Sequence, residues 1–173
     1  ALGARDVRID QGRNSVPISS TKIRDDLFAH RSFLSPRVYF DHLTKVVLLG
    51  APSTGKSTLT EKLAEHFKTT FMPEYGREYW ELNNIQRRLT SEQLLEIATT
   101  HRERELAMAY DAERYFFIDT NAITTKIFSE YYHGDALPRL RELAKETKER
   151  YDLVILCGDD IAYDDTEDRS GEA

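Results

Sequence analysis

One segment constrains the fold of this chain more than any other. It is a phosphate-binding loop of the pattern G-x-x-x-x-G-K-[ST], spanning residues 50–57, and it directly follows an apolar run at residues 45–49. In such a unit a strand delivers the backbone to a turn whose N–H groups point at phosphate oxygens, and the next helix adds the positive end of its dipole. The pattern therefore predicts a strand–loop–helix unit that binds a nucleoside triphosphate.

Each fixed position of this loop pattern has a chemical role. Gly50 and Gly55 permit the tight turn. Lys56 reaches the β- and γ-phosphates as a point charge, and Ser57 offers a hydroxyl to Mg²⁺. A glycine-rich turn without a ligand is the alternative, but the helical spacing of apolar residues over 58–67 argues against it. The residues expected to contact the nucleotide are Gly50, Ala51, Pro52, Ser53, Thr54, Gly55, Lys56, Ser57 and Thr58.

Composition limits the class of protein. With 173 residues and 40% hydrophobic content, the chain is long enough for one large domain, or for one domain plus a piece of another. The net charge is −6, and the distribution of charges along the chain does not indicate a surface that binds nucleic acid. The one cysteine, Cys157, lies in an apolar run and is expected to be a small buried hydrophobe. We find no apolar stretch of ~20 residues and no secretion signal, so a cytoplasmic protein without a membrane span is expected.

Strand-like and helical segments alternate after the loop. Strands are predicted at 69–72, 115–118 and 153–157, and helices at 58–67, 90–110, 122–132 and 137–150. The helix at 90–110 begins with a capping box formed by Thr90 and Gln93. This alternation predicts an α/β fold with a parallel sheet, in which ligands gather at the carboxyl ends of the strands.

Asp119 ends the third predicted strand, where phosphate-loop enzymes place a carboxylate near Mg²⁺ or its water shell. The alternative role for Asp119 is to cap the helix that begins near Ala122. Thr120 or Asn121 could supply that cap instead, which would leave the carboxylate for the metal.

The segment 73–80 follows the second predicted strand and combines charged and aromatic residues. Glu74 could take a proton from an acceptor hydroxyl, and Arg77 could hold a substrate hydroxyl or a phosphate. Tyr75, Tyr79 and Trp80 offer flat faces for an aromatic base, with cation–π attraction if that base is charged. In the alternative interpretation, the segment is an amphipathic helix whose aromatic residues belong to the core.

Three further features of the sequence have both a functional and a purely structural interpretation. Residues 160–169 form either a lid that brings Arg169 over the transferring phosphoryl group or an acidic tail. Residues 18–24 place hydroxyl groups ahead of a helix start, where they either contact triphosphate oxygens or only cap the helix. The histidines show no metal-ligand spacing and are assigned to the surface and to packing; they are His30, His42, His66, His101 and His133.

Together these motifs resemble one family, the bifunctional nicotinamide mononucleotide adenylyltransferase/ribosylnicotinamide kinases of bacterial NAD salvage. Residues 18–24 are similar to the closing I-S-x-T-x-I-R motif of nucleotidyltransferases. The positions that contact ATP phosphates in that motif are matched here by Ser19, Ser20, Thr21 and Arg24. The kinase loop, acceptor segment, metal strand and lid of the family are matched in turn by residues 50–57, 74–77, 117–120 and 160–169.

The resemblance implies a domain organisation and an activity. Residues 1–35 would be the tail of a nucleotidyltransferase domain, 36–44 a linker, and 45–173 a nucleoside-kinase-like P-loop domain truncated at its C-terminus. The implied reaction is phosphorylation of ribosylnicotinamide by ATP with Mg²⁺. The implied catalytic residues are Lys56, Glu74, Asp119 and Arg169, with Glu74 or Asp119 as the base. Adenylyl transfer is not expected, because the H-x-G-H-type motif of that activity is absent.

The phosphate-binding loop fixes the phosphate donor and leaves the acceptor open. A kinase for another nucleoside or for a small alcohol therefore remains an alternative. A module that senses ATP without transferring phosphate is a second one, from a different functional class. The sequence also leaves open whether the chain forms homo-oligomers.

Overall fold

The computed structural model describes residues 10–83 and 88–161, and the described part divides into two compact units. The first unit ends at Ser35 and the second begins at Pro36. The first contains a short helix and one 3₁₀ turn, which are α1 (Ser20–Asp25) and η1 (Arg31–Phe33). The second contains the sheet and the phosphate-binding loop.

Over residues 36–83 and 88–161, the second unit is built on a four-stranded sheet in which each neighbouring pair of strands is parallel. The strand order is β2-β3-β1-β4. The strands are β1 (Thr44–Leu49), β2 (Phe71–Met72), β3 (Tyr115–Asp119) and β4 (Leu153–Leu156). Because β1 lies between β3 and β4, the loop that follows it emerges in the middle of the carboxyl edge of the sheet.

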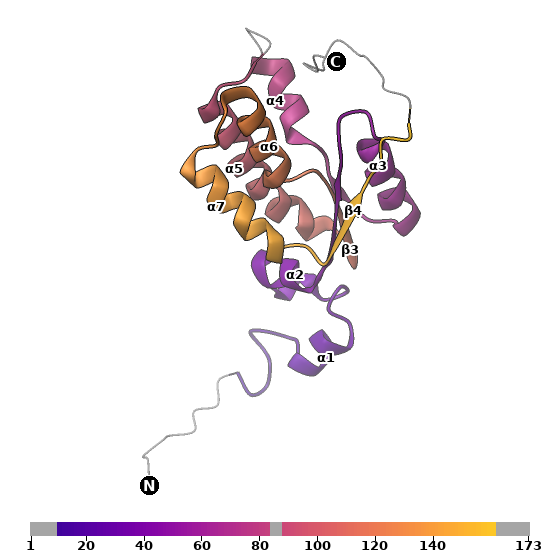
Figure 1. Cartoon of the computed structure of the whole chain (residues 1–173). Coiled ribbons are helices and arrows are strands. Elements are labelled where there is room, and N and C mark those ends of the chain that lie inside the picture. Colours follow the sequence, from indigo (N-terminus) through magenta and orange to yellow (C-terminus); the bar gives the residue numbers. More distant parts are fainter. Residues whose placement is uncertain (1–9, 84–87, 162–173) are drawn as a thin grey trace. The chain divides into compact units, whose positions relative to one another are not determined.

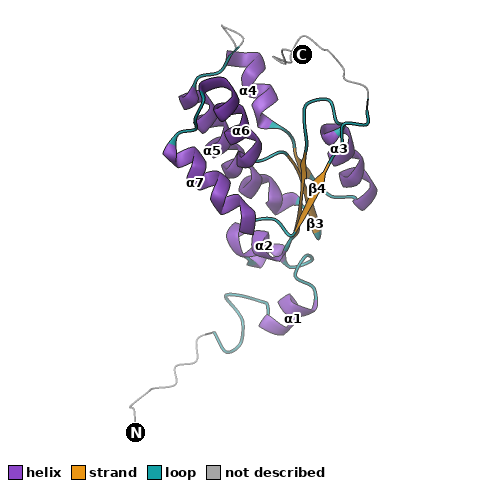
Figure 2. Ribbon diagram, viewed as in Figure 1, coloured by secondary structure: helices purple, strands orange, loops and turns teal. Residues whose placement is uncertain are grey.

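Helices cover both faces of this sheet. They are α2 (Pro36–His42), α3 (Lys56–Phe67), α4 (Tyr75–Asn83), α5 (Ser91–Met108), α6 (Ala122–His133) and α7 (Pro138–Glu146), with 3₁₀ turns η2 (Ala109–Asp111) and η3 (Thr147–Glu149). Figure 1 shows α3 on one side of the strands and α5, α6 and α7 on the other, and Figure 2 shows the same layers by type of element. This is the three-layer α/β fold that the sequence predicts.

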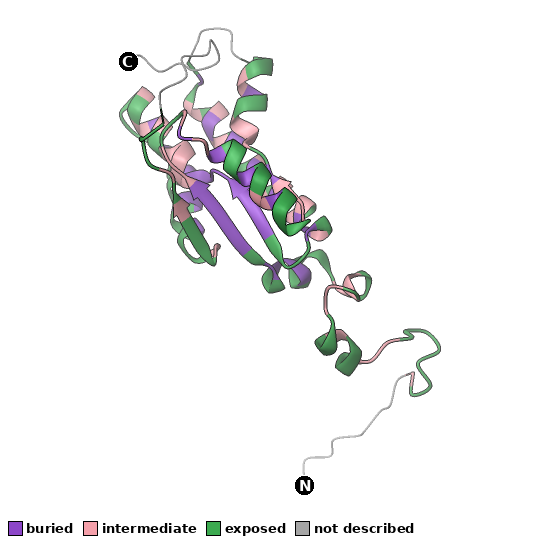
Figure 3. Cartoon of the chain, turned by 90° about the vertical axis from the view of Figure 1, so that its right-hand side faces the viewer, coloured by how far each residue is buried: buried purple, intermediate pink, exposed green. Residues whose placement is uncertain are grey.

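The core forms on both sides of the two central strands, which Figure 3 shows buried over most of their length. On the α3 side, Val46 and Phe117 of the sheet pack with Ala64 of the helix. A larger cluster joins the helices of the other layer, and Leu140 and Ile97 belong to it. The two central strands, β1 and β3, are therefore covered on both faces, which positions the loop that follows β1 and the end of β3.

The expectation of a linker over residues 36–44 is wrong, because this segment forms α2 and packs into the second unit. Tyr39 is 0% exposed and Phe40 is 3% exposed. The hydroxyl of Tyr39 donates a hydrogen bond to the carbonyl of Ala112. Pro36 is the first residue of α2, and proline is favoured in the first turn of a helix, where its missing N–H costs nothing.

The expectation that Cys157 is buried is also wrong, because it is only half-buried. The preceding strand, β4, pairs with β1 on one side and stands at the end of the strand order. Leu153 and Leu156 of this strand are 52% and 77% exposed. An apolar run predicts burial only when both sides and both faces of the strand are covered, and β4 lacks that cover among the described residues.

Candidate functional site

The phosphate-binding loop adopts a backbone conformation that its glycines make accessible. Gly50 has φ +149°, and a Cβ atom there would lie 2.7 Å from the carbonyl oxygen of Cys157. Gly55 has φ +77° and occupies the position before the first turn of α3. Both values lie in the region that side chains disfavour, so the turn requires glycine at these two positions.

Lys56 is held across the loop. Its side chain is mostly buried, with 8% of the residue exposed, and its Nζ donates a hydrogen bond of 2.7 Å to the carbonyl of Ala51. Thr54 donates to the same carbonyl through its hydroxyl at 2.8 Å. The helix α3 begins at Lys56, so the backbone N–H groups of its first turn, which have no partner within the helix, lie at the same end of the helix as the loop and Lys56. This arrangement suits a polyphosphate.

Asp119 lies beside the loop, because its register partner in the sheet is Leu48 of β1. It is 1% exposed, and neither carboxylate oxygen has a hydrogen-bond partner among the described residues. Burial raises the pKa of this carboxyl above its usual value, while Ser57, Lys56 and Arg77 oppose that shift. Such a carboxylate, buried and without a hydrogen-bond partner, is available to bind a cation.

The alternative role of Asp119 as a helix cap is excluded by the structure. Asn121 is the N-cap of α6, and its side chain accepts a hydrogen bond of 2.8 Å from the N–H of Ile123. Thr120 has φ +64°, an uncommon value for a residue other than glycine. This strained residue separates Asp119, which ends β3, from Asn121, which caps α6.

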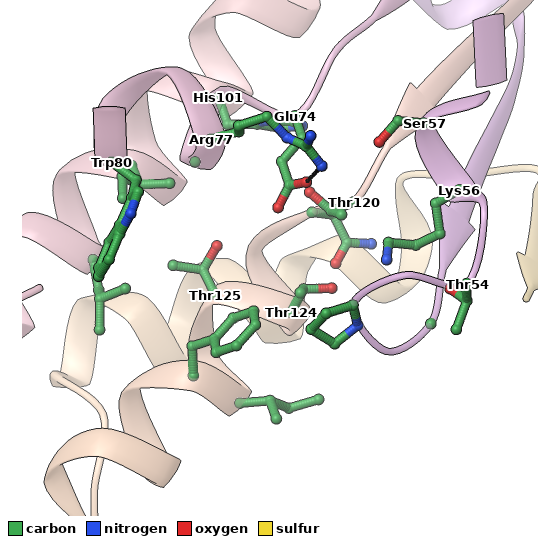
Figure 4. Close-up of a pocket in the computed structure, with 18 of the residues that line it drawn as sticks. Thr54, Lys56, Ser57, Glu74, Arg77, Trp80, His101, Thr120, Thr124 and Thr125 are labelled. Atoms are coloured by element: carbon green, nitrogen blue, oxygen red, sulfur yellow. Dashed lines mark ion pairs between the residues drawn. The ribbon is translucent and has the colours of Figure 1, made fainter. Parts of the chain in front are cut away.

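A cavity of about 530 Å³ extends from the loop to the helices. The loop contributes Gly50 and residues 52–58, and α6 and its N-terminal approach contribute a row of polar and aromatic side chains. Glu74, Arg77 and Trp80 line it from the start of α4. Figure 4 shows Lys56 and Thr54 on one side of the cavity and Trp80 on the opposite side. This volume lies within the range that is usual for small-molecule binding sites.

Glu74 and Arg77 form an ion pair within the cavity wall. Arg77 Nη2 lies 3.9 Å from Glu74 Oε2, and the side chains are 43% and 26% exposed. Because α4 begins directly after Glu74, residues 74, 77 and 80 lie on one side of the first helical turns. The structure thus brings together three of the residues that the sequence proposed for the acceptor.

Tyr75 and Tyr79, by contrast, are not among the residues that line the cavity. The guanidinium of Arg104 lies over the ring of Tyr75 at 4.0 Å from its centroid. Tyr79 is 7% exposed and donates a hydrogen bond of 2.7 Å to Glu96. This bond, assisted by burial, raises the pKa of Tyr79 to about 12. Both rings join α4 to α5. Tyr79 belongs to the hydrophobic core, Tyr75 and Trp80 pack against it, and of these three rings Trp80 alone also lines the cavity.

Several cavity residues were not identified from the sequence. They are His101 on α5 and, on or beside α6, Asn121, Thr124, Thr125, Phe128, Tyr131 and Tyr132. A usable signal for the α6 set is its spacing of three and four residues along one helix face after Asp119. No comparable signal marks His101, which the sequence assigned to the surface or to packing, although it is 4% exposed and lines the cavity.

Two groups of predicted site residues lie elsewhere. Arg169 and most of the 160–169 segment fall outside the described residues. In the first unit, Ser19 caps α1 and its hydroxyl accepts a hydrogen bond of 3.1 Å from the N–H of Lys22. The other members of that motif, Ser20, Thr21 and Arg24, are exposed.

Two features are absent from the described residues. Over 10–83 and 88–161, no three or more His, Cys, Asp or Glu side chains gather as ligands for one metal ion. No helix in those ranges has the length and apolar character needed to cross a membrane.

Comparison with known proteins agrees with the loop and the sheet. A family model described as an AAA domain matches residues 45–173, most of the chain. The chain belongs to the AAA domain family. It is also 36% identical, over 90% of its length, to the trifunctional NAD biosynthesis/regulator proteins NadR of Salmonella typhimurium strain LT2 and Escherichia coli strain K12. It spans 38% of the length of each.

Solved structures give the same result. A crystal structure of NadR in complex with NR has a TM-score of 0.63 and 25% identity, and covers 83% of this chain and 42% of that one. A structure of NadR in complex with NAD and AMP-PNP has a TM-score of 0.64, 26% identity and the same coverage. The resemblance to the NAD-salvage family that the motifs indicated is thereby confirmed.

Proposed function

We propose that this chain transfers the γ-phosphoryl group of ATP to the ribose 5′-hydroxyl of ribosylnicotinamide, which yields nicotinamide mononucleotide and ADP. The observation that carries the proposal is the cavity of about 530 Å³ that joins the phosphate-binding loop to Glu74, Arg77 and Trp80. The NadR complexes support the choice of ligands, since one contains NR and the other contains the ATP analogue AMP-PNP.

We assign a separate role in the transfer to each of these residues. The acceptor oxygen forms a bond to the γ-phosphorus while the bond to the bridging oxygen breaks, and its electron pair leaves with ADP. Lys56 and the N–H groups of the loop stabilise the negative charge. We assign the hydroxyl proton to Glu74, because this carboxylate lines the cavity and Asp119 is not one of the described lining residues.

The residues beside the loop fit Mg²⁺. Asp119 has two buried oxygens without hydrogen-bond partners among the described residues, and Ser57 is close enough to lower its pKa. Oxygen ligands of this kind suit a hard cation that keeps most of its other ligands as phosphate oxygens and water. Ser57 and Asp119 would hold the ion, which would neutralise charge on the phosphates.

Trp80 is the aromatic residue that we propose for the nicotinamide ring. It lines the cavity on the side opposite Lys56 and Thr54 (Figure 4). The ring of ribosylnicotinamide is positively charged, so the face of an indole attracts it through cation–π interaction. Orientation of the ribose between Trp80 and the loop would present its hydroxyl to the phosphate.

Product analysis by mass spectrometry tests the proposal. The chain is incubated with ATP, Mg²⁺ and ribosylnicotinamide, uridine or thymidine. Preferential formation of nicotinamide mononucleotide supports the assignment. Preferential phosphorylation of another nucleoside replaces the acceptor, and ATP binding with only slow release of phosphate indicates a nucleotide-sensing module instead.

We further propose that the first unit is the end of a nucleotidyltransferase domain. The support is the match of residues 18–24 to that motif and the N-cap at Ser19, which sets the helix start that the motif requires. This unit is not expected to transfer an adenylyl group. Incubation with ATP and nicotinamide mononucleotide should give no NAD, and formation of NAD would contradict the assignment.

A further inference from the structure

Two threonines in the first turn of α6 line the cavity without a role in the transfer described above. They are Thr124 and Thr125, and Figure 4 shows them in the stretch between Lys56 and Trp80. Thr120, which precedes the N-cap of α6, lines the cavity as well and is 6% exposed. These threonines bring hydroxyl groups to the wall that α6 and its N-terminal approach form.

The hydroxyl groups of these threonines are not used within the fold. In the interior of a helix, a threonine hydroxyl commonly donates to the carbonyl four residues earlier, as Thr60 and Thr99 do at 2.8 and 2.9 Å. Thr124 and Thr125 are too close to the start of α6 for this contact to lie inside the helix. In the part of the chain that the structure describes, no hydrogen bond involves a hydroxyl of Thr120, Thr124 or Thr125. Their partners must therefore be water or a ligand in the cavity.

The side chains that α6 presents to the cavity change from polar to aromatic along the helix. Thr124 is followed one turn later by Phe128, and Phe128 is followed by Tyr132; both rings line the cavity. Their centroids lie 5.8 Å apart, with an angle of 24° between the ring planes. One helical turn advances by about 5.4 Å, so the hydroxyl groups lie about one turn before the first ring. This wall suits a ligand in which a polar group is joined directly to an aromatic ring.

The described residues of α6 that line the cavity carry no charged side chains. They are Thr124, Thr125, Ile127, Phe128, Tyr131 and Tyr132. Hydroxyl groups both donate and accept hydrogen bonds, which suits a neutral group with hydroxyls of its own, whereas Lys56 and the N–H groups of the loop suit a phosphate. In a nucleoside that reaches from the loop to Trp80, the neutral part between the reacting oxygen and the base is the ribose.

We propose that the first turn of α6 is the ribose subsite of the cavity, where Thr124 and Thr125 hydrogen-bond the 2′- and 3′-hydroxyls of the acceptor. The pair thereby selects ribonucleosides over nucleosides that lack these hydroxyls. The inference rests on the proposed function and deepens it, since it concerns how the sugar of the acceptor is recognised. A site that hydrogen-bonds a ligand hydroxyl leaves its own groups unpaired when an analogue lacks that hydroxyl, so the analogue binds more weakly.

Binding measurements on paired variants and ligands test this assignment through a double-mutant cycle. Isothermal titration compares ribosylnicotinamide with its 2′,3′-dideoxy analogue. Wild type should bind the dideoxy analogue about 10- to 100-fold more weakly, as expected for two lost hydrogen bonds. The double variant Thr124→Val, Thr125→Val keeps the β-branched shape and removes both hydroxyls, so its affinities for the two ligands should differ by less than about threefold.

Further variants show whether the hydroxyl groups are responsible. The double variant Thr124→Ser, Thr125→Ser retains both hydroxyls and should keep most of the wild-type preference. Thr99→Val is the matched control, because Thr99 is exposed and its hydroxyl is hydrogen-bonded within α5, so the preference should not change. Thermal unfolding shows which variants are folded. If the double Val variant does not fold, the single variants Thr124→Val and Thr125→Val replace it, and each should lose part of the preference.

The titrations need no turnover, so they separate this inference from the proposed function. Binding of ribosylnicotinamide without formation of nicotinamide mononucleotide would contradict the proposed function, and the cycle would still decide the inference. If ribosylnicotinamide does not bind, the same cycle is run with uridine and 2′,3′-dideoxyuridine. Equal binding of both members of a pair by wild type would overturn the inference. A preference that persists in the Val variants, or a chain that binds neither nucleoside, would also overturn it.

Discussion

At the scale of single residues, Lys56 is the side chain on which the proposed transfer most directly depends. Lys56→Ala removes the charge that faces the terminal phosphates, so we expect kcat to fall by at least about 100-fold with the fold intact. Product analysis measures the activity, and circular dichroism with thermal unfolding measures the fold. Lys62→Ala on the same helix is the control, because its side chain is 65% exposed and pairs only with neighbouring acids among the contacts described. Retained transfer in Lys56→Ala would remove the loop from the mechanism.

The buried, charged side chain of Asp119 is expected to lower the free energy of unfolding. Burial raises the pKa of Asp119, so the folded state binds its proton more tightly than the unfolded state does. The charged form therefore opposes folding, and this cost is absent at low pH and grows as pH rises through the folded pKa. Asp119→Asn should raise the melting temperature by a few degrees at pH 7 and abolish transfer.

Thermal unfolding of wild type and Asp119→Asn across pH checks this expectation. The difference between the two melting temperatures should shrink as the pH is lowered and Asp119 becomes protonated. An Asn variant that is less stable than wild type at pH 7 would contradict it.

The sequence located Asp119 because a carboxylate after a strand is a local pattern. It gave no sign of His101, because the burial of His101 depends on contacts between distant helices.

At the scale of the element, the turn after β1 is the part most sensitive to backbone substitution. Gly50→Ala would place a Cβ atom 2.7 Å from the carbonyl oxygen of Cys157 at φ +149°. Gly134→Ala is the matched comparison, since Gly134 also has positive φ, +77°, but a Cβ there would meet no atom within 4 Å. The second change should cost about 1–2 kcal/mol of unfolding free energy, and the first should cost clearly more and weaken nucleotide binding.

Urea unfolding and titration with an ATP analogue measure both effects. If Gly50→Ala is no more destabilising than Gly134→Ala, the close approach to Cys157 does not limit this turn. Local elements of this kind could be predicted because their signals lie within a few residues. The capping box at the start of α5 is an example, since Thr90 and Gln93 make both of its hydrogen bonds, at 2.9 and 3.2 Å.

Other elements could not be predicted, because their environment depends on distant parts of the chain. The helix α2 is too short to show a clear apolar period, and its burial depends on Ala112 and Tyr110, far along the sequence. The strand β4 has the composition of an interior strand, yet its position in the sheet leaves it exposed. Tyr75, Tyr79 and Trp80 are all aromatic, and only their positions on α4 place Trp80, and neither tyrosine, at the cavity.

At the scale of the whole molecule, the division into two units fixes what each part of the chain contributes. The unit from Pro36 onward contains α2, the sheet and the cavity, whereas the first unit ends at Ser35. The sequence placed the boundary of the kinase-like part at residue 45, because it could detect the first strand and could not detect the helix before it, which packs against η2 and α5. The structure places α2 with the cavity-bearing unit, and this difference can be measured.

Two shortened forms of the chain distinguish these boundaries. Removal of residues 1–35 should leave the melting temperature within about 2 °C of the full chain, because the second unit is compact by itself. Removal of residues 1–43 also deletes Tyr39 and Phe40, which are 0% and 3% exposed. Loss of one such aromatic side chain typically costs about 3–5 kcal/mol, so this form should unfold far below the first or fail to fold. Equal melting temperatures for the two forms would show that α2 is a linker after all, and the contacts of Phe40 with Arg150 would then carry no stability.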